Sequence, residues 1–160
     1  TLAETKLYLR IDGTEEDALI TDLISAARNH AEVWMRRSLV TQRWELRQVH
    51  VPGLPIKLVL GPVQNIVQVK SVYQAQETTL TSTQYRFDAT TASVEILSVA
   101  ETDHIKVTYD AGYGDAPDVP AAIRQGLLAC CAYHYEKRGD GEGIPDNAKK
   151  FWQEYREVNL

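Results

Sequence analysis

The spacing of apolar residues changes twice along this chain, and that change constrains the fold more than any other feature. Over residues 15–38 apolar residues recur every three or four positions, which is the spacing of a helix with one buried face. Over 42–110 apolar and polar residues alternate in short runs, as they do in strands with one buried face. Helical spacing returns over 119–138. This order of helix, strands and helix predicts the α+β class.

The amino-terminal part is expected to form two helices. Thr1 and Glu4 fit a capping box, so a short helix is predicted over residues 2–11. Acidic residues at 15–17 suit the positive end of a helix dipole, and one long helix is predicted over 15–38. Its apolar face is expected to hold Leu19, Ile20, Leu23, Ile24, Ala27, Ala31 and Trp34.

The middle of the chain is expected to form a small antiparallel sheet or sandwich. Its apolar runs are short, and turns that contain Pro and Gly, such as residues 52–55 and 61–62, separate them. The alternation in the first run places Trp44 toward the core.

The carboxy-terminal part is expected to contain a further helix over 119–138, a Gly-rich linker over 139–145 and a terminal helix over 146–160. The apolar residues of the terminal helix share one face: Ala148, Phe151, Trp152, Tyr155 and Val158. Such an aromatic face is not stable in water. Two interpretations stay open: the helix folds back onto its own body, or it docks into a groove of a partner.

Charge and composition narrow the functional classes. The 160 residues carry 17 Lys and Arg against 22 Asp and Glu, a formal net charge of −5, whereas a free-standing duplex-DNA binder usually has the opposite sign. No apolar run reaches the roughly 18 residues of a transmembrane helix, and no signal peptide is recognisable. The only cysteines, Cys130 and Cys131, are adjacent and rarely bridge in that arrangement, which suggests a reducing compartment.

The residues that might carry catalysis do not complete a known set. His30 and Glu32 match half of a zinc deaminase signature, but the cysteine half is absent. Cys130, Cys131 and His134 share a helical region without a fourth ligand at metal-site spacing. The sequence therefore predicts no enzyme, no metal and no cofactor.

Several segments in a fixed order resemble a known family. The long helix begins Glu15-Glu16-Asp17, and Leu60-Gly61-Pro62-Val63 precedes a strand ending in Val72-Tyr73. Tyr109-Asp110-Ala111-Gly112-Tyr113-Gly114 then leads to Val119-Pro120, and the next helix ends in Tyr133-His134-Tyr135-Glu136-Lys137-Arg138. Over about residues 2–138, this set resembles the head–tail connector (adaptor) family of long-tailed phages and phage-derived gene transfer agents.

The resemblance implies a structural role. Adaptor subunits form a dodecameric ring between the portal and the stopper or other neck protein that leads to the tail, and DNA passes through the ring without specific binding. It implies a place at the head–tail junction of a virion or gene transfer agent particle, assembled in the bacterial cytoplasm, with no membrane. Residues 1–138 would be the adaptor body. In relatives the carboxy-terminal segment grips the portal, so the expected portal-docking residues are Ala148, Phe151, Trp152 and Tyr155.

A ring also needs contacts between neighbouring subunits and a lumen that releases DNA. Three cations of the long helix, Arg28, Arg36 and Arg37, are expected at the subunit interface. We also expect a net negative lumen, because negative charge repels phosphate. The alternatives are another neck component, such as a stopper or tail-completion protein, and a β-type carbohydrate-binding module with an aromatic platform. That platform would consist of Trp44, Tyr73, Tyr85 and Tyr113.

Overall fold

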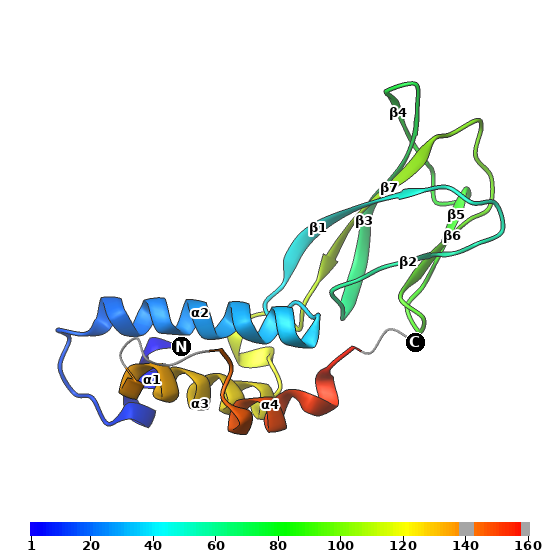
Figure 1. Cartoon of the computed structure of the whole chain (residues 1–160). Helices are drawn as coiled ribbons and strands as arrows, with labels where there is room; N and C mark the ends of the chain where they lie inside the picture. The colour runs from blue at the N-terminus through cyan, green and yellow to red at the C-terminus, as the bar shows by residue number, and fades with distance from the viewer. Residues whose placement is uncertain (138–142, 158–160) are drawn as a thin grey trace. The chain divides into compact units, whose positions relative to one another are not determined.

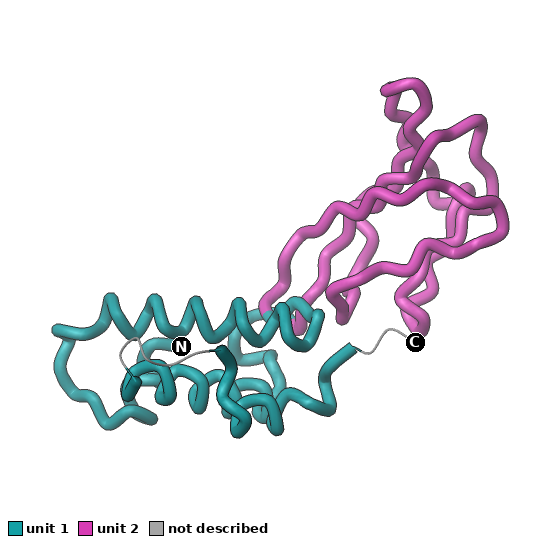
Figure 2. Tube along the Cα trace, in the orientation of Figure 1, with its two compact units in different colours: residues 1–39, 114–160 teal, residues 40–113 magenta. Residues whose placement is uncertain are grey.

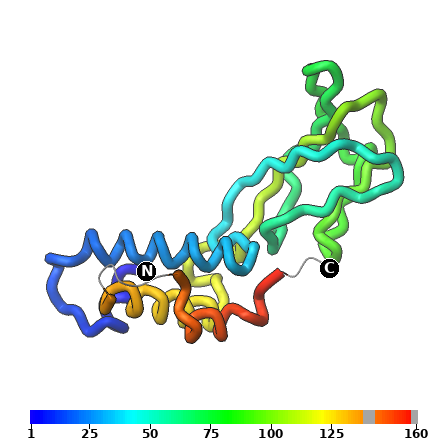
Figure 3. Tube along the Cα trace, in the orientation of Figure 1, coloured from blue at the N-terminus to red at the C-terminus, as the bar shows by residue number. Residues whose placement is uncertain are grey.

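The computed structural model describes residues 1–137 and 143–157, and the chain divides into two compact units. One unit combines residues 1–39 with 114–160, and the other consists of residues 40–113 (Figure 2). The described helices all belong to the first unit and the strands to the second, so the predicted α+β class is confirmed. The chain leaves the helical unit after residue 39 and returns to it at residue 114 (Figure 3). The helical unit is therefore discontinuous in sequence.

The first two helices of the helical unit both end at an arginine. Helix α1 (Leu2–Leu9) begins with the predicted capping box and ends at Arg10, whose φ is 59°. Helix α2 (Asp17–Met35) ends at Arg36, whose φ is 56°. Both helices stop short of the predicted ends at residues 11 and 38. The left-handed conformation that ends them usually requires glycine, so the sequence gives no signal for either end.

The carboxy-terminal helices are also shorter than predicted. Helix α3 (Ala121–Lys137) follows a 3₁₀ turn, η1 (Ala116–Asp118), and an extended Val119. Helix α4 (Asp146–Trp152) passes into a second 3₁₀ turn, η2 (Gln153–Tyr155), and Arg156 is extended.

In the described part of the helix predicted over 146–160, a seven-residue α-helix is followed by a 3₁₀ turn and an extended Arg156. Most of the predicted linker, and Val158, lie outside the described residues. The proposed division into a body over 1–138, a linker over 139–145 and a segment over 146–160 is functional, and the two structural units do not test it.

The core of the helical unit consists mainly of small and aliphatic side chains. The buried residues of α2 form one stripe at helical spacing: Ile20, Ala27, Ala31 and Met35. Leu19, which the sequence placed on that face, is 43% exposed. Helix α3 contributes Ile123, Gly126, Ala129, Cys130 and Cys131. Small residues on both helices allow their backbones to approach closely.

The sheet unit contains two antiparallel sheets in its described residues (Figure 1). The larger sheet has the order β1-β7-β3-β4, and the smaller has the order β2-β6-β5. Gln74 and Ala75 join β3 to β4 with positive φ angles at both positions, as in the two-residue turns that suit a twisted hairpin. The strands are β1 (Gln42–Val49), β2 (Ile56–Lys57), β3 (Val63–Tyr73), β4 (Gln76–Thr79), β5 (Tyr85–Asp88), β6 (Ser93–Ile96) and β7 (His104–Ala111).

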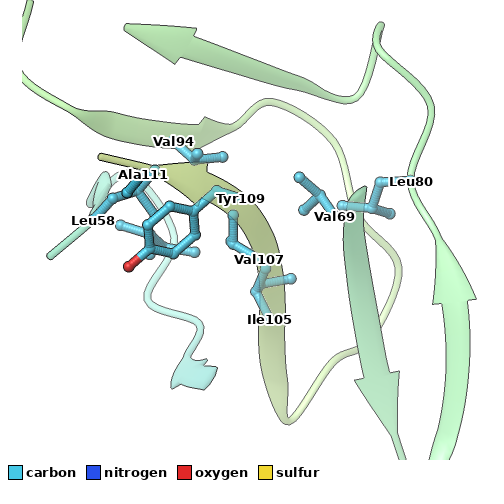
Figure 4. Close-up of a cluster of buried hydrophobic side chains, with 9 residues drawn as sticks. Leu58, Val69, Leu80, Val94, Ile105, Val107, Tyr109 and Ala111 are labelled. Atoms are coloured by element: carbon cyan, nitrogen blue, oxygen red, sulfur yellow. The ribbon is translucent and has the colours of Figure 1, made fainter. Parts of the chain in front are cut away.

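The hydrophobic core of the sheet unit is built around β7, where buried and half-buried residues alternate strictly. Its buried side chains pack against Leu58, Val69, Leu80 and Val94 (Figure 4). The Tyr109 hydroxyl donates a hydrogen bond of 2.8 Å to the Val59 carbonyl, which satisfies the one polar atom of that buried ring. Trp44 packs against this cluster, as the alternation predicted.

Candidate docking segment

Residues 146–157 carry the aromatic side chains that the sequence assigned to docking, and they fold against the helical unit. Trp152 is fully buried, and α4 packs on α3. The Nε1 of Trp152 donates a hydrogen bond of 3.2 Å to the carbonyl oxygen of Ile123. A buried indole usually finds such a partner, because an unpaired N–H in an apolar core is costly. The segment is therefore anchored by its largest side chain.

A glycine of α3 makes room for that indole. A Cβ atom built on Gly126 would lie 2.2 Å from Trp152 Nε1 and 2.8 Å from two further ring carbons. No side chain fits at such distances, so the absence of one at Gly126 forms the notch. Ala148, one turn earlier on α4, is also fully buried.

The structure thus has the first of the two arrangements left open by the sequence, in which the segment folds back onto its own body. Ala148 and Trp152 would have to leave this core to touch a partner. Their portal-docking role stays a prediction.

The end of the segment is fastened to the last turn of α2. The Glu157 N–H donates to the Met35 carbonyl at 3.0 Å, and the Arg37 guanidinium donates to the Tyr155 carbonyl. Arg37 also pairs with the Glu157 carboxylate at 3.6 Å. Because Met35 and its neighbours are the last residues of α2, their carbonyls lack partners within the helix. The segment supplies the partner of the Met35 carbonyl.

A row of contacts between two indole rings and a guanidinium continues this attachment. The Trp34 ring lies 6.3 Å from the Trp152 ring, and the Arg156 guanidinium lies 4.9 Å from the Trp34 centroid. That distance is within the range of a cation–π interaction. Arg156, Trp34 and Trp152 therefore form one continuous row of contacts from the surface to the core, in which the two indole rings are tilted by 51°.

Two of the predicted docking residues remain accessible. Phe151 is 44% exposed, and Tyr155 is half-buried. Phe151 is the large apolar side chain of this segment that a partner can reach without unfolding it.

The three arginines predicted at a subunit interface lie in different surroundings. Arg28 pairs with Glu32 of the same helix at 3.9 Å, and Arg36 is exposed at the end of α2. Arg37 holds the carboxy-terminal segment, so it is the one predicted interface residue that the structure brings together with a predicted docking residue, Tyr155. Their interface role stays a prediction.

Sequence reasoning missed the residues that receive the segment. Gly126 sits inside a helix, where glycine is unfavourable, and such a glycine often has a packing reason. That was the available signal. Nothing in the spacing linked Trp34 to Arg156, or Met35 to Glu157, because these pairs are more than a hundred residues apart in the chain.

The residues considered for catalysis are buried or packed against other side chains. Burial raises the pKa of the Cys130 thiol to about 11 and that of the Cys131 thiol to about 12. His30 and His134 stack with their ring centroids 5.9 Å apart. Across the described residues, no three His, Cys, Asp or Glu side chains come together as metal ligands. None of the described helices is both long and apolar enough to span a bilayer.

The aromatic platform expected of a carbohydrate-binding module is not assembled. Trp44 and Tyr85 pack against the core of the sheet unit, while Tyr73 is exposed. Tyr73 lines a hollow of about 410 Å³ with Gln76, Thr78 and other mostly polar residues. At least two of the four platform residues, Trp44 and Tyr85, therefore contact the hydrophobic core.

Comparison with known proteins relates this chain to one protein family and to several solved structures. A family model described as "Head completion protein" matches residues 1–143. A comparison with curated proteins finds no match. The fold matches three solved structures at 21–22% sequence identity, over 99% of this chain.

The three structures are described as components of gene transfer agent (GTA) particles. One is "Neck of empty GTA particle computed with C6 symmetry", with a TM-score of 0.82 over 90% of that chain. The second is "Virion of native gene transfer agent (GTA) particle", with a TM-score of 0.81 over 90% of that chain. The third is "Neck of native GTA particle computed with C12 symmetry", with a TM-score of 0.81 over 89% of that chain. At this level of identity the match establishes a shared fold.

Proposed function

The chain belongs to the head completion protein family, and from that membership we propose that it is a head–tail adaptor in the neck of a tailed phage or gene transfer agent particle. The observation that carries the proposal is the fold match to neck components over 99% of the chain. A match of that extent includes both the helical and the sheet unit, so it does not rest on one common motif.

We propose that copies of the chain form a closed ring between the portal and the next neck protein. Twelve copies would match the C12 symmetry of one neck structure that shares the fold. A ring closes through head-to-tail contacts between different surfaces of the same subunit. The formal net charge of −5 suits a channel that DNA crosses without being held. The role requires no catalysis.

Within this role, the carboxy-terminal segment is proposed to contact the portal with Phe151 while Trp152 keeps it seated. Aromatic side chains that insert into a partner's pocket commonly dominate binding. Phe151 is exposed and Trp152 is buried in the adjacent position, so one residue is free to contact a partner and the next fixes the segment.

The test is the native mass of the chain mixed with the portal ring of its own particle. Addition of a closed ring of copies directly to the portal supports the adaptor role. A chain that binds only after another neck protein has bound to the portal is a stopper or tail-completion protein. A chain that binds neither the portal alone nor the portal with that neck protein is not an adaptor.

A pair of variants separates the segment from the rest of the body. Phe151→Ala is expected to weaken portal binding about tenfold or more, the usual cost of truncating an aromatic anchor. Val67→Ala is the matched control, because Val67 of the sheet unit is 41% exposed and Phe151 is 44% exposed. Equal affinities for the two variants would remove Phe151 from the contact.

A further inference from the structure

The four-stranded sheet has two open edges, β1 and β4, in the described part of the chain. Strand β1 pairs with β7 over eight consecutive residues without a register shift, and it contains no proline. A long regular edge strand offers a row of unused backbone N–H and C=O groups, and proteins usually protect such edges with bulges or prolines. Neither a bulge nor a proline is present in β1, and its charged residues are Arg43, Glu45 and Arg47.

The opposite edge is held in place for pairing. All residues of β4 are exposed, and β4 pairs with β3 in an unbroken register. The Asp103 carboxylate accepts a hydrogen bond of 2.9 Å from the Gln74 N–H in the turn between the two strands. This bond fixes the hairpin from outside, so β4 is a preformed edge.

The strand directions allow the two edges to meet in successive copies. Each pair in the order β1-β7-β3-β4 is antiparallel, so β1 and β4 run in opposite directions. A copy related by rotation about an axis along the strands keeps its strand directions. Its β1 would then lie antiparallel to β4 of the first copy, and the antiparallel pattern would continue unbroken. A sheet with an odd number of strands would instead require a parallel joint.

Charge along one face supports the same joint. Glu77 of β4 pairs with Lys70 of β3 at 2.9 Å and with Lys106 of β7 at 2.7 Å. Lys106 in turn pairs with Glu45 of β1 at 3.3 Å, so the ion pairs cross all four strands. Arg47, on the same face of β1, has no carboxylate at ion-pair distance among the described residues. Glu77 thus lies at the β4 edge of this face, and at the β1 edge Glu45 is paired while Arg47 has no ion pair within the described residues.

We propose that β4 of one copy pairs with β1 of the next copy, so that the sheet continues from subunit to subunit around the ring. This inference rests on the proposed ring. The contact is heterologous, because one edge meets the other edge of a neighbour, and such contacts close when the rotation closes. Ring closure also removes both open edges of the four-stranded sheet, which is the most complete protection a sheet can have.

The registers inside the sheet predict which residues meet. Gln48, Ile105, Ser71 and Thr78 occupy one row across the four strands. Without stagger, Thr78 would face Gln48 of the next copy, and Glu77 would be diagonal to its Arg47. A stagger of two residues would put Glu77 directly opposite Arg47. Both arrangements bring opposite charges within reach.

Engineered disulfides test the joint on the portal-bound ring. The paired variants are Gln48→Cys with Thr78→Cys for no stagger, and Gln48→Cys with Gln76→Cys or Val49→Cys with Thr79→Cys for a stagger of two residues in either direction. The two edges of one sheet are three strand spacings apart, about 14 Å, which no disulfide spans. Any bond must therefore join two chains. Gln48→Cys with Thr21→Cys, at an exposed position of α2, is the matched control.

The expected result is a ladder of covalently linked chains that reaches the full ring for one of the three pairs. Single variants and the control pair are expected to show no covalent links between chains when the ring is denatured without reductant. A ring that forms without crosslinks in any of the three pairs overturns the strand pairing and leaves the adaptor role intact. Bonds between chains in the control pair instead would place Gln48 against the helical unit of a neighbouring copy and overturn it too. If the wild-type chain forms no ring, the proposed function fails and the joint fails with it.

Hydrogen exchange on the wild-type chain gives a second readout that needs no substitution. Ring assembly is expected to slow exchange of edge amides within 42–49 and 76–79 by at least tenfold, because each gains a backbone partner. Unchanged exchange at both edges in an assembled ring overturns the proposal, whatever the cysteine variants do.

Discussion

Replacing Gly126 by alanine is expected to destabilise this protein, although the same change stabilises most helices. Alanine is favoured over glycine in a helix interior by about 1 kcal/mol. Here the new Cβ would lie 2.2 Å from Nε1 of Trp152 and 2.8 Å from two carbons of its ring. The indole cannot retreat without losing its bond to the Ile123 carbonyl, so the substitution acts by displacing a fully buried tryptophan.

The magnitude follows from the two opposing effects. Loss of a buried Trp or Phe side chain from a core costs about 3–5 kcal/mol. Subtracting the helix gain of about 1 kcal/mol leaves a net loss of about 2–4 kcal/mol in the free energy of unfolding. The measurement is urea denaturation followed by circular dichroism of the helices. Gln125→Ala is the matched control on the same helix, and because Gln125 is exposed we expect a change within about 0.5 kcal/mol.

A double variant isolates the cause. Trp152→Ala removes the ring that the new Cβ meets, so adding Gly126→Ala in that background is expected to stabilise the helix by up to about 1 kcal/mol. The sign of the effect thus reverses between the two backgrounds. If Gly126→Ala stabilises the wild-type chain, Trp152 does not occupy the notch, and the argument for a seated carboxy-terminal segment fails.

Three further changes test other parts of the structure. Two lysines lower the pKa of Glu77 to about 2, so Glu77 contributes stability above its unfolded pKa that is lost as the pH falls toward 2. The difference in urea midpoint between wild type and Glu77→Gln is therefore expected to shrink from pH 5 to pH 2, and a constant difference would contradict it. Burial of Cys130 and Cys131 predicts negligible alkylation by iodoacetamide at pH 8 without denaturant and full alkylation in urea, and rapid labelling of the folded chain would contradict it. Arg37→Ala is expected to expose the carboxy-terminal segment to limited proteolysis, whereas Arg36→Ala, its exposed neighbour, leaves cleavage unchanged; equal cleavage of both would remove Arg37 from that attachment.

Local chemistry made part of the fold predictable. The capping box at Thr1 and Glu4 and the alternation around Trp44 are short-range patterns, and the structure confirms both. The ends of α1 and α2 were not predictable, because arginines adopt the conformation that glycine usually marks. The assignment of Leu19 to the buried face was wrong, because the buried stripe of α2 is narrower than its apolar pattern.

The candidate site shows a different limit of sequence reasoning. Periodicity identified the buried face of α4 only in part. Ala148 and Trp152 are buried, but Phe151, which was predicted on the same face, is 44% exposed. Periodicity did not identify what that face contacts, because a helix that docks on its own body and one that docks on a partner have the same pattern. In this chain the face packs on α3, where Gly126 leaves room for Trp152. That contact joins residues far apart in the chain, so the spacing of apolar residues does not reveal it.

Seating of the segment changes how a portal contact should be understood. A portal that bound Trp152 itself would first have to withdraw that side chain from its core, which costs about 3–5 kcal/mol. New contacts with the portal would have to offset that free energy. A portal that contacts Phe151 on the seated segment does not have to withdraw any side chain from the core, because Phe151 is already 44% exposed. The two modes differ in one measurable respect. If the seated segment is the docking surface, Gly126→Ala weakens portal binding together with stability, whereas if the released segment docks, the same substitution strengthens binding, since the release has already been made.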